Sequence, residues 1–149
     1  MNWIKDEYTL TDQFDDLDFE IIHGFLKDSY WAAEIPKDLV KKSCQNSLCF
    51  GIYKDKGQVG FGRIITDYAT FAFISDVFVL DAHRKKGLAD WMLSCMRDHP
   101  LLQGLRRWML ATLDAHALYG RHSFQPLKHP DWFMEIANPG IYRQLPDQR

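Results

Sequence analysis

Near its middle, the chain changes the period of its hydrophobic pattern twice, and this feature most strongly limits the fold. Residues 70–80 form a long β-rich, mostly apolar run, which predicts a largely buried strand. Over residues 88–99 apolar side chains recur at helical spacing until Pro100 ends the helix, and residues 105–112 predict another strand. A strand, a helix and a strand in this order almost always give two parallel strands with a right-handed crossover.

The residues before this βαβ unit predict two helices and a hairpin. The first third of the chain is predicted to be helical, with one helix after Asp18 and a second over residues 36–46. Residues 48–53 and 59–65 are β-rich and flank a Lys-Asp-Lys-Gly turn, which is typical of a hairpin. The expected fold class is α/β: a mixed, mostly antiparallel sheet with a central parallel βαβ unit, flanked by helices. A short helix over residues 115–121 and at most one or two further strands should complete it.

The composition excludes several classes of protein. With 149 residues and 46% hydrophobic residues, the chain can bury one core, so we expect residues 1–149 to form a single domain. Its 18 basic and 20 acidic residues give a net charge of −2, which argues against nucleic acid or an anionic membrane as the main partner. No apolar run approaches the roughly 20 residues of a membrane span, and no secretory leader is visible, so a cytoplasmic location is expected.

Common cofactor motifs are also missing from the sequence. The three cysteines lack C-x-x-C spacing and are expected to be reduced core thiols. His116, His122 and His129 do not have the spacing of metal ligands, so no metal is expected. Gly60-Phe61-Gly62 lacks the third glycine and the following helix of a dinucleotide-binding motif.

A basic turn, residues 82–87, leads directly into the predicted helix over residues 88–99. Its three cations add positive charge, and Gly87 and Ala89 leave room near the helix start. The first N–H groups of a helix have no partner within it and lie at the positive end of its dipole. The turn is therefore a candidate diphosphate site, although composition alone favours a solvated basic turn that caps the helix. It lies at the sheet edge where open α/β sheets bind ligands.

Residues 77–93 resemble the acetyl-CoA motif of the GNAT N-acetyltransferase superfamily, in which a strand is followed by Arg84-x-x-Gly87-x-Ala89 and a helix. The order of the predicted elements and the pattern Ala115-x-x-x-Tyr119-x-x-x-x-Phe124 extend this resemblance over most of residues 8–127. The resemblance implies the GNAT fold and acetyl-CoA as co-substrate. It further implies that the CoA pyrophosphate binds Arg84, Lys85, Lys86, Gly87, Leu88 and Ala89, and that the pantetheine arm pairs with Val77, Phe78 and Val79.

Three positions depart from the family pattern. Thr112 stands where many members carry Asn, but it can still form hydrogen bonds and is expected near the cofactor. Ser123 replaces the Gly that usually precedes the Phe of the last motif. Asp90 places an acid next to the expected diphosphate.

Acetyl transfer to an amine requires a neutral amine, stabilisation of the oxyanion and a proton for the leaving thiolate. The resemblance implies that Tyr119 is the general acid. Asp76 interrupts an apolar strand and is a candidate base, directly or through water; a purely structural carboxylate explains it equally well. Asp114, His116 or a water chain are the alternative bases.

Tyr30 and Trp31 lie in the loop between the first two helices, where the family covers the acceptor, so they are candidate substrate-binding residues; anchoring that loop is their alternative role. The resemblance implies transfer of an acetyl group to a primary amine of a small molecule or peptide by direct attack in a ternary complex. The oligomeric state stays open, although members of the family often form homodimers through C-terminal segments. Two rival hypotheses are a non-catalytic acyl-CoA-binding sensor or partner module and a protein-interaction domain without cofactor. The sequence does not identify the acceptor or the length of the acyl chain.

Overall fold

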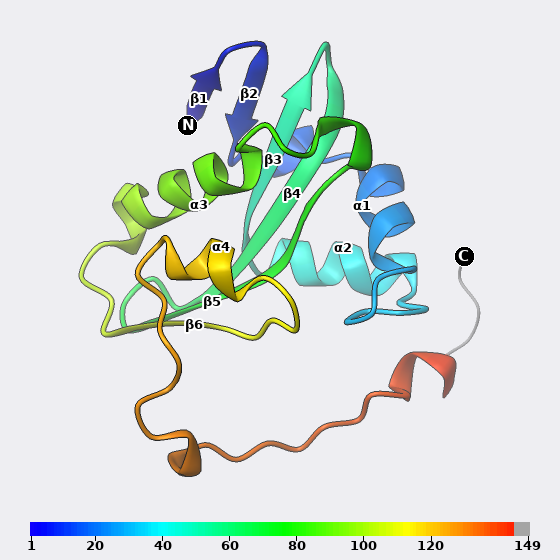
Figure 1. Ribbon diagram of the computed structural model, residues 1–149. Coiled ribbons are helices and arrows are strands. Elements are labelled where there is room, and N and C mark those ends of the chain that lie inside the picture. The colour runs from blue at the N-terminus through cyan, green and yellow to red at the C-terminus, as the bar shows by residue number, and fades with distance from the viewer. Residues whose placement is uncertain (145–149) are drawn as a thin grey trace.

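A six-stranded mixed sheet is the centre of the computed structural model, which describes residues 1–144 (Figure 1). Adjacent strands are antiparallel except for β5 and β6, which are parallel. In chain order, which is also their order in the sheet, the strands are β1 (Asn2–Lys5), β2 (Tyr8–Thr11), β3 (Leu48–Lys54), β4 (Gly57–Thr66), β5 (Phe71–Val79) and β6 (Arg107–Leu110). The helices are α1 (Phe19–Leu26), α2 (Lys37–Gln45), α3 (Leu88–Asp98) and α4 (His116–Gly120).

The mixed sheet, the hairpin and the parallel crossover are confirmed, with the parallel pair at the end of the strand order. The hairpin turn between β3 and β4 has two central residues with positive φ, Asp55 at 50° and Lys56 at 69°. Two such residues give the turn a twist that matches that of the flanking strands. The second parallel strand, Arg107–Leu110, is shorter at both ends than the predicted 105–112.

The prediction that the first third of the chain is wholly helical is wrong for residues 2–11, which form the hairpin β1–β2. Strands of four residues carry too few alternations for the period of two to be evident. The hairpin is stabilised instead by a distant partner, because β2 pairs with β3, and Leu10 lies opposite Ile52. Tyr8 and Leu10 point inward and are buried.

The helices form layers on the two faces of the sheet (Figure 1). The helix α3 covers one face, where Phe50, Ile52, Met92, Leu93 and Met96 belong to one buried cluster. The helices α1 and α2 cover the other face, and that buried cluster includes Ile22, Leu26, Val40, Phe61 and Phe78. None of the helices in residues 1–144 is both long and apolar enough to cross a membrane.

The described chain after α4 ends in an extended arm, residues 125–144, which we call the C-terminal arm. It runs below β6 towards α2 (Figure 1) and, up to residue 144, contains short 3-10 turns but no strand. Its far end is anchored, because Tyr142 packs against the cluster under α1 and α2, and the Arg143 Nε donates to Glu34 at 2.6 Å.

We expect Leu10→Ala to lower the free energy of unfolding by about 2–5 kcal/mol, because it opens a cavity in a fully buried part of the sheet. Ile4→Ala is the matched control on the same hairpin, since Ile4 is mostly exposed; its effect should be below about 0.5 kcal/mol. Urea titration of both variants measures the difference, and equal effects would show that β1–β2 is not part of the core.

Candidate active site

The parallel strands β5 and β6 stop pairing after Ile74 and Leu110, and a cavity lies where they separate. It has a volume of about 530 Å³. Its walls come from the end of β5, the segment after β6, the loop between α1 and α2, and α4. It brings together six of the residues expected at the site: Tyr30, Trp31, Asp76, Val77, Thr112 and Tyr119.

The open edge of β5 offers unpaired backbone groups to this cavity. The Leu80 N–H donates to Val59 O at 2.8 Å, on the β4 side. Because strand residues alternate, Val77 and Val79 direct their backbone groups to the opposite side; Val77 faces this cavity, whereas the Val79 carbonyl accepts from Arg84 Nε at 2.9 Å. Phe78 is arranged differently: its backbone pairs with β4 and its ring stacks on Phe25, with centroids 4.1 Å apart.

The basic turn before α3 presents free amides. Lys85 and Gly87 have φ of 63° and 74°, and successive N–H groups in such turns form a concave anion site. Within residues 1–144, no hydrogen bond engages the N–H groups of Lys85 through Asp90. A Cβ added to Gly87 would meet no atom within 4 Å, so the approach is open. A cavity of about 260 Å³ lies here, lined by Arg84, Lys85, Gly87, Leu88 and Ala89 among others; Lys86 is not among its lining residues.

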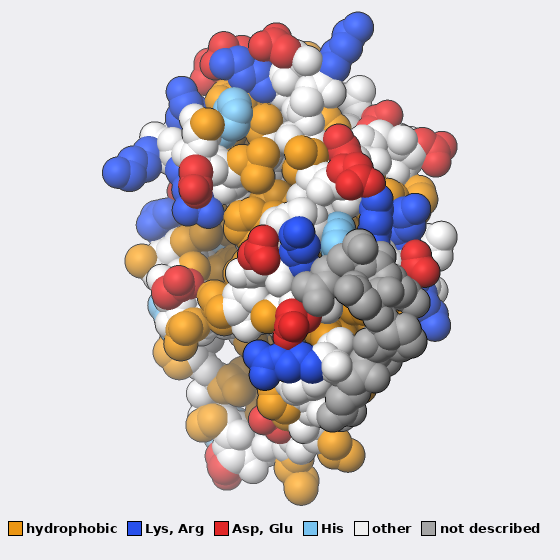
Figure 2. Space-filling model, turned by 90° about the vertical axis from the view of Figure 1, so that its right-hand side faces the viewer, with side chains coloured by type: hydrophobic (Ala, Val, Ile, Leu, Met, Phe, Trp, Pro, Cys, Tyr) orange, Lys and Arg blue, Asp and Glu red, His pale blue; other side chains and the backbone are white. Residues whose placement is uncertain are grey.

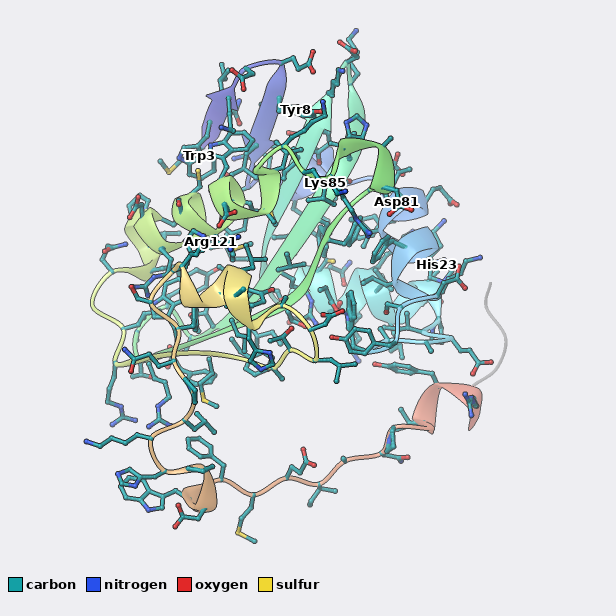
Figure 3. All side chains as sticks on the ribbon, viewed as in Figure 1. Trp3, Tyr8, His23, Asp81, Lys85 and Arg121 are labelled. Atoms are coloured by element: carbon teal, nitrogen blue, oxygen red, sulfur yellow. The ribbon has the colours of Figure 1, made fainter. Side chains whose placement is uncertain are left out.

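Arg84 holds the turn against the strand. Its Nε donates to Val79 O at 2.9 Å, and its Nη1 pairs with Asp81 Oδ1 at 2.9 Å. Lys85 and Lys86 are exposed, and within residues 1–144 neither forms an ion pair. Figure 3 shows Lys85 in this turn and Asp81 on the short 3-10 helix that precedes it.

A contact from β2, which no local pattern predicts, also fixes this turn. The Tyr8 hydroxyl and His83 Nδ1 lie 2.9 Å apart, and the two rings meet edge to face. Tyr8 is buried, whereas His83 lines the cavity at the turn. The N-terminal hairpin therefore supports the candidate anion site directly.

Asp90 is neutralised by residues at the end of α4. Its carboxylate accepts hydrogen bonds from Arg121 Nε at 3.1 Å, Arg121 Nη2 at 2.9 Å and His122 Nε2 at 2.9 Å. Arg121 is the main cause that lowers the pKa of Asp90, and His122 contributes. Asp90 thus joins α3 to α4, and its negative charge is offset by Arg121, which is labelled in Figure 3.

Tyr119 reaches the cavity from α4. Burial raises its pKa to about 12, with smaller contributions from Tyr30 and Asp114. Within residues 1–144, no protein group forms a hydrogen bond with its hydroxyl, and its ring meets Phe124 edge to face. The hydroxyl is therefore protonated at neutral pH and available to a ligand.

The loop after β6 is fixed by two hydroxyl groups. Thr112 Oγ1 accepts from Ala115 N at 3.1 Å at the start of α4. The Tyr30 hydroxyl accepts from Leu113 N at 3.2 Å, which joins the two sides of the cavity mouth. Asp114 lines the same cavity, whereas His116 lines a separate cavity of about 360 Å³ beneath α4.

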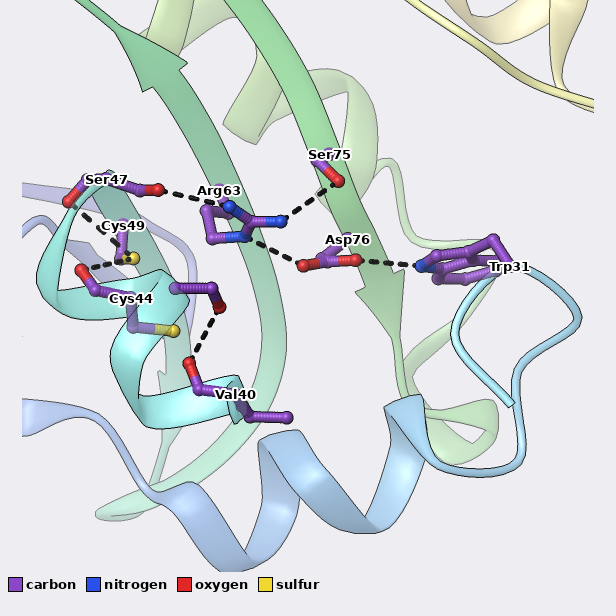
Figure 4. A network of polar contacts seen from close by, with 9 residues as sticks. Trp31, Val40, Cys44, Ser47, Cys49, Arg63, Ser75 and Asp76 are labelled. Carbon is purple, nitrogen blue, oxygen red and sulfur yellow. Dashed lines mark hydrogen bonds and ion pairs between the residues drawn. The ribbon is translucent and has the colours of Figure 1, made fainter. Parts of the chain in front are cut away.

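Asp76 lies at the centre of a polar network (Figure 4). It has φ of 58° within β5, a conformation that costs a non-glycine residue about 1–2 kcal/mol. Its two carboxylate oxygens accept from Arg63 Nε at 2.8 Å and from Trp31 Nε1 at 2.9 Å. The Arg63 and Asp76 side chains are only 13% and 9% exposed. The carboxylate therefore has a structural partner on each oxygen.

Among the described residues, no three His, Cys, Asp or Glu side chains are placed to hold a metal ion. On the face shown in Figure 2, acidic and basic side chains are interspersed around apolar ones. The distinctive chemistry of the site is instead the combination of free amides, an open strand edge and a buried phenol.

Comparisons with known proteins show the family and the fold. Residues 45–126 match the family model of the acetyltransferase (GNAT) domain. A putative acetyltransferase of Gibberella zeae is 31% identical over 144 residues, covering 81% of this chain and 80% of its own. The crystal structure of a putative acetyltransferase of the GNAT family from Xanthomonas campestris superposes with a TM-score of 0.89 at 46% identity, covering 91% and 96% of the two chains. A predicted acetyltransferase from Clostridium acetobutylicum, crystallised with acetyl-CoA, shares the fold with a TM-score of 0.65 at 13% identity, covering 87% and 94%.

We expect Asp76→Ala to lower the free energy of unfolding by about 3–5 kcal/mol, because it leaves the mostly buried Arg63 without its carboxylate. Asp81→Ala removes an exposed ion pair with Arg84 and is the control, with a loss below about 1 kcal/mol. Chemical denaturation of both variants provides the comparison. A loss for Asp76→Ala as small as that of the control would contradict a structural role for this ion pair.

Proposed function

The chain belongs to the GNAT acetyltransferase family, and from this premise we propose that it transfers an acetyl group from acetyl-CoA to a primary amine. The observation that carries the proposal is the position of the free amides of residues 85–90 next to the open edge of β5 and Tyr119. Together they provide an anion site, a backbone edge and a proton donor along one path.

Acetyl-CoA would bind along this path in an extended form. The amides of residues 85–90 would hold its pyrophosphate, with Lys85 and Lys86 adding positive charge. The backbone groups of Val77 and the N–H of Val79 would pair with the pantetheine arm, since the Val79 carbonyl is engaged by Arg84. Thr112 would act through the start of α4, which its hydroxyl already holds.

The acceptor amine would attack the thioester carbonyl directly. A C–N bond forms and the C–S bond breaks, the amine nitrogen loses a proton, and the CoA sulfur gains one. Tyr119 would donate a hydrogen bond to the departing sulfur. The pKa is about 12 for the phenol and about 8.5 for a thiol, so complete transfer of the Tyr119 proton to the thiolate is uphill by roughly 5 kcal/mol. If Tyr119 gives up its proton, the phenolate must therefore be reprotonated in the same step.

The general base is the less constrained part of the mechanism. Asp114 lines the cavity and lies close enough to Tyr119 to raise its pKa. We assign proton removal to Asp114, directly or through water. Asp76 takes a positioning role, since both its oxygens already accept hydrogen bonds.

The rival function is an acyl-CoA-binding module without transfer, and Tyr119→Phe separates the two. As an acetyltransferase, the variant should lose a factor of about 10² to 10⁴ in kcat, because the leaving thiolate lacks its donor. CoA affinity, measured by calorimetry, should stay the same. Release of CoA is followed with a thiol reagent over a panel of primary amines. Binding of acetyl-CoA without CoA release from any amine would favour the rival.

A second expectation of the mechanism concerns pH. Because the pKa of Tyr119 is raised, the phenol stays protonated up to about pH 12, and its ionisation should cause no alkaline fall in kcat below about pH 11. A fall near pH 10 that disappears in Tyr119→Phe would contradict the buried donor.

The anion site is tested by Gly87→Ala with Gly104→Ala as its matched control. Both glycines have positive φ, 74° and 79°, and both have open space where a Cβ would be added. Both variants should therefore lose about 1–2 kcal/mol of stability from backbone strain. Only Gly87→Ala should weaken CoA binding, by about tenfold, because it disturbs the amides that hold the pyrophosphate. Equal CoA affinity in the two variants would place the pyrophosphate elsewhere.

We also propose that two copies of the chain associate through the C-terminal arm. Met134 is 98% exposed and Ile136 is fully exposed, although both lie in an apolar stretch. Apolar side chains project at the lower end of the molecule, where the arm lies (Figure 2). In the described chain, the outer edge of β6 has no strand beside it, so the arm of a second copy could add there. The acids Asp131 and Glu135 on the arm complement Arg106 and Arg107 at the start of β6.

The double variant Met134→Glu, Ile136→Glu should convert a dimer into a monomer in size-exclusion chromatography with light scattering. Ile4→Glu, which changes an exposed apolar residue on β1, should leave the mass unchanged. A monomeric wild-type protein at high micromolar concentration would refute association through the arm.

A further inference from the structure

A second cavity lies behind Trp31, on the side of α2, and nothing in the proposed mechanism uses it. Its volume is about 470 Å³. It shares Trp31, Ser75 and Asp76 with the cavity of the candidate active site, so the indole and its hydrogen bond to Asp76 form the partition between the two. A ligand that reaches past Trp31 would contact both cavities.

The two cavities differ in charge. The active-site cavity contains the carboxylates of Asp76 and Asp114 and no cationic side chain. The second cavity contains two cations, Lys42 and Arg63, against the single carboxylate of Asp76. An amine or its ammonium form is therefore favoured in the active-site cavity, and an anion in the second cavity, on the other side of Trp31.

The two cations have unused hydrogen-bonding capacity. Arg63 donates through Nε to Asp76, through Nη1 to Ser47 at 3.1 Å and through Nη2 to Ser75 at 3.4 Å. An arginine has five N–H groups, so two remain. Lys42 lines the cavity and forms no ion pair with any described residue. Figure 4 shows Arg63 fixed in place by these contacts, with its guanidinium next to Asp76 and Ser75.

The wall of the cavity is completed by the C-terminal arm. Tyr142 lines it and packs against the core below α1 and α2. Its neighbour Arg143 is paired with Glu34, so its charge is offset. The cavity therefore keeps a surplus of one positive charge, which matches the single negative charge of a carboxylate better than the double charge of a phosphate.

We propose that the acceptor carries a carboxylate that binds Lys42 and Arg63, several bonds away from the amine that receives the acetyl group. This inference rests on the proposed acetyltransferase function and names its substrate class. Because the amine and the carboxylate occupy cavities on opposite sides of Trp31, an ω-amino acid fits and an α-amine next to its carboxylate does not.

Calorimetry on the protein saturated with CoA tests the site without any transfer. The probes are 5-aminopentanoate, its α-amino isomer norvaline, pentylamine without the carboxylate, and 5-aminopentyl phosphate. We expect 5-aminopentanoate to bind about tenfold more tightly than the other three, from its charge-assisted hydrogen bonds. Equal binding of pentylamine, or no binding of 5-aminopentanoate, overturns the carboxylate site. Tighter binding of norvaline overturns the spacing, and tighter binding of the phosphate overturns the choice of anion.

Lys42→Met supplies the matched variant, and Lys41→Met supplies its control. Lys41 is the neighbouring exposed lysine, which lies over the Phe19 ring and not in the cavity. Lys42→Met should reduce the preference for 5-aminopentanoate over pentylamine and weaken its dependence on salt, with Arg63 accounting for what is left, and Lys42→Arg should restore both. Lys41→Met should leave the preference unchanged; if it has the effect of Lys42→Met, the site is refuted.

Turnover separates this inference from the proposed function. Acetylation of pentylamine at least as fast as 5-aminopentanoate, judged by kcat/KM, overturns the substrate class and leaves the transferase intact. CoA release from no amine, together with tight binding of 5-aminopentanoate, overturns the transferase and leaves the carboxylate site.

Discussion

The separation of β5 from β6 after Ile74 is the constraint on which the rest of the site depends. Two parallel strands that continued to pair would leave no open edge and no cavity. Asp76, which has positive φ, lies two positions beyond the last residue of β5 that pairs with β6. The pairing of β4 with β5 also shifts register here. The ion pair of Asp76 with Arg63 on β4 holds the irregular strand in place. The same carboxylate accepts from the Trp31 indole, so one side chain sets both the strand geometry and the position of the loop over the cavity.

The electrostatics of the turn rely on the backbone more than on side chains. Arg84 is engaged with Val79 and Asp81, and Asp90 is neutralised by Arg121 and His122. These pairs offset the charges of Arg84 and Asp90, and leave Lys85 and Lys86 as the two exposed cations of the turn. The groups whose positions are fixed and which do not titrate are the free amides at the start of α3. The proposed pyrophosphate site is therefore compatible with the net charge of −2 of the chain.

The parts of this arrangement that depend on local patterns could be predicted from the sequence, and those that depend on distant contacts could not. The period change around residue 88 predicted the crossover and placed the basic turn at the helix start. The β1–β2 hairpin was missed because its stability comes from pairing with β3, not from its own short pattern. The partners of Asp76 were also hidden, since Trp31 is 45 residues away and Arg63 is 13. The contact between Tyr8 and His83 spans 75 residues, and no local signal precedes it.

The same network explains how the carboxylates can divide the work of the reaction. For Asp76 to accept a proton, an oxygen would have to give up a hydrogen bond from Arg63 or Trp31. Loss of the negative charge would leave the mostly buried Arg63 unpaired, and removing one partner of such a pair costs about 3–5 kcal/mol. Asp114 is exposed at the mouth of the cavity, and within residues 1–144 its carboxylate has no such ion pair to lose. The structural role of Asp76 and the proposed proton removal therefore fall to two different carboxylates, Asp76 and Asp114.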